Sequence, residues 1–105
     1  WHGPPGFDDI HGLTNFKEQV MKPFYAAFPD YYVENDIVCA DDKWVSATGY
    51  LTGTHNGVYL DIEPTGKAIK MQFSDFWLVK DGKFSENFVM VDNYSVLKQM
   101  GLNFS

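Results

Sequence analysis

The sequence has no arginine and only eight lysines, against fourteen aspartate and glutamate residues, and its formal net charge is −6 over 105 residues. Proteins that bind nucleic acids use basic patches and arginine side chains, so this charge balance argues against a nucleic-acid partner. The lack of arginine also argues against a bidentate clamp for a phosphate or carboxylate group. We therefore expect the ligand to be a neutral or apolar small molecule.

Cysteine is almost absent as well. Cys39 is the only one, so no internal disulfide can form, which fits a reducing compartment, and we expect the cytoplasm. No apolar run approaches the roughly 20 residues of a membrane-spanning helix, so no membrane partner is expected. The histidines His2, His11 and His55 lack metal-ligand spacing, and no phosphate-binding or dinucleotide-binding glycine motif is present. We predict neither a metal site nor a cofactor.

Aromatic residues, in contrast, are abundant. They make up 17% of the chain, which is more than a small core needs, so we expect some of them to line a cavity or an interface. The length fits a single domain over residues 1–105.

The hydrophobic pattern changes period once along the chain. Residues 13–28 carry apolar side chains every three or four positions, which predicts a helix, and Pro23 should kink it. After this helix the period becomes two, and strands are predicted over 31–40, 43–54, 68–80 and 83–92, followed by a short helix over 94–100. This order predicts an α+β fold with a curved antiparallel sheet.

Asp81-Gly82 predicts a two-residue turn, because this pair accepts the positive φ angles of a type I′ hairpin. If Lys80 pairs with Lys83, Asp75 faces Phe88 across the hairpin. Opposite residues share a face, so this register places one set of side chains together: Ile69, Met71, Phe73, Asp75, Trp77, Val79, Phe84, Glu86, Phe88, Met90 and Asp92.

Three acids on an apolar face point to chemistry. A buried carboxylate is costly unless it is paired or protonated, and an acid with a raised pKa can act as a general acid or base near neutral pH. The alternatives are structural: Glu86 near the turn could be solvated, Asp75 could be a buried and partnered acid, and Asp92 could cap the last helix.

Several motifs follow one another along nearly the whole chain. They are WHGPPG at 1–6 with HGL at 11–13, FPD at 28–30, LTGTHNG at 51–57 with PTGK at 64–67, the segment 75–92 around DGK, and LKQMGL at 97–102. Together these motifs resemble the SnoaL-like family of polyketide cyclases, within the NTF2-like superfamily.

The resemblance implies a cone-shaped α+β fold, in which a curved sheet wraps a long helix around a deep apolar pocket, and a homodimer through the sheet. In cyclase members a pocket aspartate on the last strand is the acid/base for an intramolecular aldol closure without metal or cofactor, and Asp92 matches it. The resemblance also places His2, His55, Asp75 and Phe88 in the pocket.

The sequence departs from the family pattern in three places. The Glu-His-Trp run of the last strand is Glu86-Asn87-Phe88 here, and an Arg-Trp pair on the central strand is Thr48-Gly49. The helical hairpin that family members carry before the position of Trp1 is absent from this sequence, so we expect the cone to be open at one end unless a partner or residues missing from this sequence close it.

The first functional hypothesis is a cofactor-independent cyclase or isomerase that acts on an apolar carbonyl compound. Asp92 would be the catalytic acid/base, and the substrate-binding residues would be His55, His2, Asp75, Phe73, Trp77, Phe88 and Met90. Two alternatives remain open: a non-catalytic domain that binds a hydrophobic small molecule, and an interaction domain with a dimer interface at Phe76, Leu78, Val89 and Val91.

Overall fold

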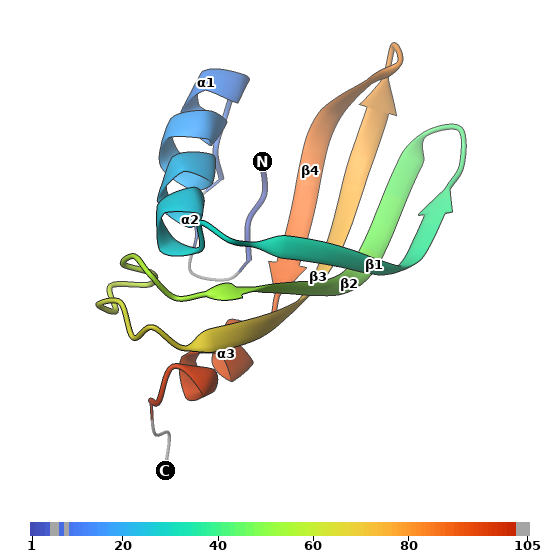
Figure 1. Cartoon of the computed structure of the whole chain (residues 1–105). Helices are drawn as coiled ribbons and strands as arrows, with labels where there is room; N and C mark the ends of the chain where they lie inside the picture. Colours follow the sequence, from blue (N-terminus) through green and yellow to red (C-terminus); the bar gives the residue numbers. More distant parts are fainter. Residues whose placement is uncertain (5–6, 8, 103–105) are drawn as a thin grey trace.

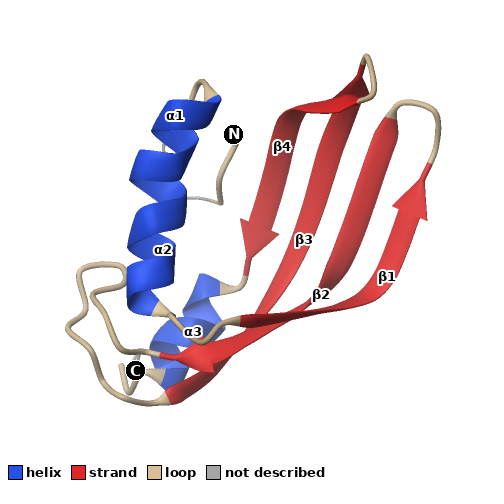
Figure 2. Cartoon of the chain, turned by 45° about the horizontal axis from the view of Figure 1, so that its top comes forward, coloured by secondary structure: helices blue, strands red, loops and turns tan. Residues whose placement is uncertain are grey.

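The structure is a computed structural model that describes residues 1–4, 7 and 9–102. The chain begins with a loop segment along the sheet edge, continues into a helix and then forms a sheet (Figure 1). The helix comprises α1 (Leu13–Phe16), the π-helical turn η1 (Lys17–Met21) and α2 (Lys22–Ala27). These three pieces form one continuous helix (Figure 2), which confirms the helix predicted over 13–28.

A π-helical turn precedes Pro23, the residue at which the sequence predicts a kink. A proline has no backbone N–H, and its ring crowds the carbonyl four residues earlier, here that of Gln19. Gln19 lies inside η1. The π-helical turn thus lies where the proline disturbs the regular hydrogen bonding of the helix.

The sheet contains β1 (Tyr32–Ala40), β2 (Trp44–Thr54), β3 (Ala68–Lys80) and β4 (Lys83–Val91), in the order β1-β2-β3-β4 with antiparallel neighbours. It is strongly curved, and the helix lies over its concave face at one end (Figure 2). The prediction of an α+β fold with a curved antiparallel sheet is therefore confirmed.

The predicted register of the last hairpin is wrong by one residue over most of its length. Lys80 pairs with Lys83 and Val79 with Phe84 as expected, but a β-bulge follows, and Leu78 pairs with Glu86. Ser85 is the extra residue. Side chains alternate between the two faces of a strand, so one added residue moves all later β4 side chains to the opposite face.

The bulge therefore separates residues that the sequence placed together. On β4 the concave face carries Asn87, Val89 and Val91, opposite Trp77, Asp75 and Phe73 respectively. The convex face carries Glu86, Phe88 and Met90. The dimer interface proposed from the sequence is likewise divided, because Phe76 and Leu78 lie on the convex face and Val89 and Val91 on the concave one.

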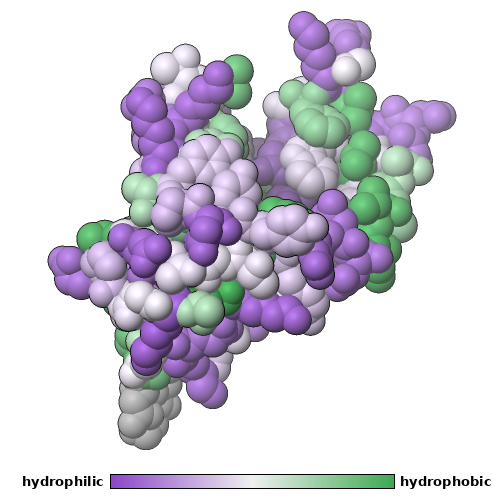
Figure 3. Space-filling model, in the orientation of Figure 1, coloured by the Kyte–Doolittle hydropathy of each residue, from purple (hydrophilic) through white to green (hydrophobic). Residues whose placement is uncertain are grey.

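The core lies where the end of the helix meets the first residues of β3 and the last helix, α3 (Asn93–Gln99). Its buried members are Ala27, Phe28, Ile69, Met71, Val96 and Met100. The opposite end of the sheet is uncovered. Every residue of β1 is exposed. Hydrophobic side chains are visible at this uncovered end of the sheet, on the right in Figure 3.

Among the described residues, no helix combines the length and the apolar character needed to cross a membrane.

Candidate functional site

A cavity of about 660 Å³ lies between the helix and the concave face of the sheet. This volume is within the range of about 300–1,000 Å³ that is usual for small-molecule sites. Its wall is mainly apolar, with Val20, Met21 and Phe24 from the helix and Phe73 and Trp77 from the sheet. The described residues of the wall include two charged side chains, those of Asp61 and Asp75, and no lysine or histidine.

Asp75 is the half-buried carboxyl of this wall. It lies in the middle of β3, with Ala47 opposite it on β2 and Val89 opposite it on β4. Burial raises the pKa of Asp75, and a hydrogen bond from Asn87 partly opposes this rise. A carboxylate with a raised pKa binds a proton more readily than an ordinary carboxylate, which suits it to act as a base in an apolar cavity.

Asn87 holds this carboxyl in place. Its side-chain Nδ2 donates to Oδ1 of Asp75 and to the main-chain oxygen of Phe76, each at 3.2 Å. Among the described residues, no other group hydrogen-bonds the Asp75 side chain. The second carboxyl oxygen is therefore open to a molecule in the cavity.

Tyr59 closes the cavity on the side of the loop over residues 55–67. Burial raises its pKa to about 12, so the phenol stays neutral, and its hydroxyl donates to Oδ1 of Asn93 at 2.9 Å. Its ring packs edge-on against Phe24 and Phe28, with centroid distances of 6.2 and 5.0 Å. These contacts hold the loop against the helix.

The structure places three of the residues predicted for substrate binding on the cavity wall, namely Phe73, Asp75 and Trp77. It places Phe88 and Met90 on the convex face, because of the bulge at Ser85, so their predicted position in the pocket is wrong.

His2 also lies outside the described cavity wall. Its ring stacks on Phe88 at 4.2 Å, with Nδ1 at 3.1 Å from Asp9 and Nε2 at 3.0 Å from Glu86. Its main chain pairs with β4 through His2 N to Asn87 O and Val89 N to His2 O. His2 thus joins the N-terminal segment to the sheet, while Trp1 of the same segment reaches the cavity.

His55 is fully buried beside the cavity and does not line it. Its Nδ1 accepts a hydrogen bond from the main-chain N–H of Thr65 at 3.2 Å, and its own main chain bonds to Lys67 and Gly66. His55 therefore joins the two ends of the loop over residues 55–67. Its position gives no support for the predicted contact with a substrate.

Asp92 caps α3. Its Oδ1 accepts from the main-chain N–H of Ser95 at 3.0 Å, and the residue is exposed. Its main-chain N–H bonds to Gln72, so the register assigns Asp92 to the convex face, and the expectation that it lies in the pocket is wrong. Asp92 therefore has the structural role considered from the sequence, that of the N-cap of the last helix.

Two residues of the site, Asn87 and Tyr59, were not predicted from the sequence. Asn87 was placed on the wrong face by the register. Tyr59 lies in a loop without periodicity, so its burial had no signal in the sequence.

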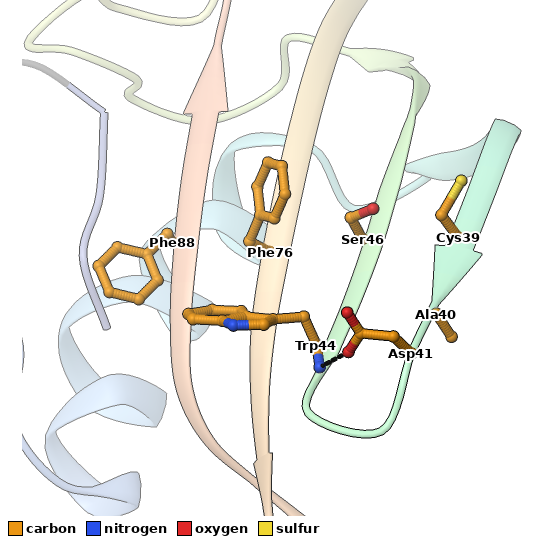
Figure 4. Close-up of a pocket in the computed structure, with 7 residues that line it drawn as sticks. All are labelled: Cys39, Ala40, Asp41, Trp44, Ser46, Phe76 and Phe88. Atoms are coloured by element: carbon orange, nitrogen blue, oxygen red, sulfur yellow. Dashed lines mark hydrogen bonds between the residues drawn. The ribbon is translucent and has the colours of Figure 1, made fainter.

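A second hollow, of about 600 Å³, lies on the convex face of the sheet. Figure 4 shows the indole of Trp44 beside the rings of Phe76 and Phe88, with Cys39 and Asp41 across the groove. Phe76 is 50% exposed and Phe88 38%, so aromatic surface is open to solvent here.

A family model described as SnoaL-like polyketide cyclase matches residues 2–100 of the chain. The chain belongs to the SnoaL-like polyketide cyclase family. No curated protein matches the sequence.

Solved structures of SnoaL-like and NTF2-like proteins share the fold. A protein of Jannaschia sp. CCS1, provisionally named a SnoaL-like polyketide cyclase, superposes with a TM-score of 0.87 at 17% identity, over 98% of this chain and 70% of that one. A provisionally named polyketide cyclase of Acidithiobacillus ferrooxidans gives a TM-score of 0.79 at 26% identity, over 95% and 71%. An NTF2-like protein of Burkholderia thailandensis gives 0.79 at 19%, over 97% and 75%. The superpositions with these three proteins cover 95–98% of this SnoaL-like chain.

Proposed function

We propose that this SnoaL-like protein is a cofactor-independent cyclase or isomerase that acts on an apolar carbonyl compound, with Asp75 as the acid/base. The observation that carries the proposal is the position of Asp75, a half-buried carboxyl with a raised pKa in an apolar cavity. Family membership supports a cyclase-type activity.

The reaction is an intramolecular aldol closure. The Asp75 carboxylate removes a proton from the carbon next to a carbonyl, and the resulting enolate attacks a second carbonyl of the same molecule. One C–H bond breaks and one C–C bond forms. The protonated Asp75 then returns its proton to the new alkoxide, so the product is an isomer of the substrate. Phe73 and Trp77 would hold the apolar rings of the substrate.

Enolisation of a simple ketone tests the first step without the natural substrate. 2-Tetralone in D₂O exchanges its α-protons for deuterium, which proton NMR follows directly. We expect the protein to accelerate this exchange and Asp75→Asn to lose about a hundredfold or more of the acceleration, as is typical when a general base is removed.

Asp92→Asn is the matched control. The same substitution at the helix cap should leave the exchange rate unchanged, because asparagine caps a helix about as well as aspartate. Full activity in Asp75→Asn, or loss in Asp92→Asn alone, would overturn the role of Asp75. Saturable binding of 2-tetralone without accelerated exchange would favour the non-catalytic binding domain instead.

We also propose that two copies of the chain associate through the convex face of the sheet. The observation that supports this homodimer is the exposed apolar surface around the groove of Figure 4. Phe76, Phe88, Met90 and Ile37 are 50%, 38%, 55% and 59% exposed. Large apolar side chains that gather on one exposed face commonly mark a surface of association.

A further inference from the structure

Two two-residue hairpin turns of the structure have positive φ at both central positions. The residues of one turn suit this conformation, whereas the other turn begins with a leucine. The first is the turn at Asp81-Gly82, where φ is 54° and 74°. The second is at Leu60-Asp61, where φ is 49° and 61°. In the second turn, Tyr59 and Ile62 exchange both main-chain hydrogen bonds, at 3.1 and 2.9 Å.

A two-residue hairpin with positive φ at both central positions is a type I′ turn, which favours asparagine, aspartate or glycine. Asp81-Gly82 meets this requirement at an exposed tip. Leu60 does not meet it, because a bulky side chain in the left-handed region is strained. The chain thus has the favourable residue where the turn faces solvent and an unfavourable one in the other turn.

The residues around Leu60 explain why the turn is tight. The Tyr59 ring packs against Phe24 and Phe28, and its hydroxyl bonds to Asn93. Ile62 packs against the buried core. Both sides of the turn are therefore held, and only two residues connect them. The short connection accounts for the positive φ angles of the turn. It does not explain why a leucine occupies position 60.

The position of the side chain supplies the missing reason. Leu60 is half-buried and lines the cavity together with its neighbours Val58 and Asp61. Backbone strain that persists beside a binding cavity is a common mark of a functional position.

We propose that Leu60 is a specificity-determining residue that contacts the ligand, and that the strained turn holds its side chain against an apolar molecule in the cavity. The inference rests on the proposed function only in taking the cavity as the ligand site, and it requires no chemistry at Asp75.

The proposal predicts opposite effects on stability and on binding. Leu60→Asn places the preferred residue of a type I′ turn at this position, so the melting temperature should rise by a few degrees. The same change removes an apolar contact with the ligand, so affinity should fall by about tenfold or more. A leucine that only packs within the protein would lower stability when replaced.

The experiment uses 1-aminoanthracene, a neutral three-ring fluorophore that brightens in apolar surroundings. Fluorescence titration gives its affinity for the full chain, and thermal unfolding without the probe gives stability. Asp81→Leu is the matched control, because it places a leucine at the same position of the other turn, away from the cavity. It should lower the melting temperature and leave the probe affinity unchanged.

Unchanged probe affinity in Leu60→Asn would overturn the proposal, and so would a fall in its melting temperature. If the wild-type chain does not bind 1-aminoanthracene, both this inference and the cavity as a ligand site are overturned. If the wild type binds the probe but does not accelerate exchange in 2-tetralone, only the catalytic proposal fails.

Discussion

The side chain of Asn87 donates a hydrogen bond to Oδ1 of Asp75 at 3.2 Å, across two neighbouring strands and on the cavity side of the sheet. The second bond of Asn87, to the main chain of Phe76, fixes the direction of its amide. Burial raises the pKa of Asp75, while this amide favours the ionised carboxylate. Asn87 is therefore a positioning residue that tunes the proposed acid/base.

Replacing Asn87 by leucine should raise the pKa of Asp75 further, because a donor to the charged form is removed and burial remains. A carboxyl ¹³C NMR titration of Asp75 measures the change, and the rate of α-proton exchange should rise at a correspondingly higher pH. Asn35→Leu is the control, since Asn35 lines the cavity without a bond to Asp75. An equal shift in both variants would show that general cavity polarity, and not this hydrogen bond, is responsible.

Asp75→Asn should be more stable than the wild type at neutral pH. The folded-state pKa of Asp75 is raised, so the folded protein binds this proton more tightly than the unfolded chain does. The penalty for ionising the buried carboxyl is therefore absent below the ordinary pKa of 3.8 and fully present above the raised one. Urea unfolding of both proteins between pH 3 and pH 8 should show a stability difference that grows with pH across this window. A constant difference would contradict the raised pKa.

Gly49→Ala should destabilise the fold strongly. Gly49 lies opposite Asn35, where β1 has a bulge, and a Cβ on Gly49 would collide with the main-chain oxygen of Glu34 and approach the Asn35 Cα to 2.9 Å. Overpacking of this kind usually costs about 1–3 kcal/mol, and rigid backbone neighbours favour the upper end. The free energy of unfolding in urea measures it. Gly53→Ala, whose nearest neighbour would be the Phe28 Cβ at 3.3 Å, should cost less.

Phe76→Asp should convert the proposed homodimer into a monomer, because it places a charge in the apolar groove of the convex face. Sedimentation velocity at micromolar concentration separates the two states. Phe84→Asp is the comparison, since Phe84 is 62% exposed and stacks on Trp77 of the concave face. A monomeric wild-type protein, or dissociation by both variants alike, would contradict an interface at the groove.

Local signals predicted the elements well. Each strand boundary lies within one residue of its predicted position, because apolar alternation and the turn residues Asp81-Gly82 act between near neighbours. Gly101 ends the last helix with φ at 103°, as expected for a C-cap glycine. The kink predicted at Pro23 did not anticipate the π-helical turn Lys17–Met21 that precedes this residue, since more than one distortion of a helix accommodates a proline.

The sequence by itself determined the α+β architecture, the hairpin at Asp81-Gly82 and the presence of Phe73, Asp75 and Trp77 on one face of β3. These features depend on periodicity and turn chemistry, which are local. Only the tertiary structure decided which side of β4 faces the cavity, because a single bulge at Ser85 exchanges the two faces of that strand. That exchange brings Asn87 to Asp75 and leaves Asp92 to cap α3. The strain at Leu60 arises in the same way, from distant core contacts of Tyr59 and Ile62 that no neighbouring residue reveals.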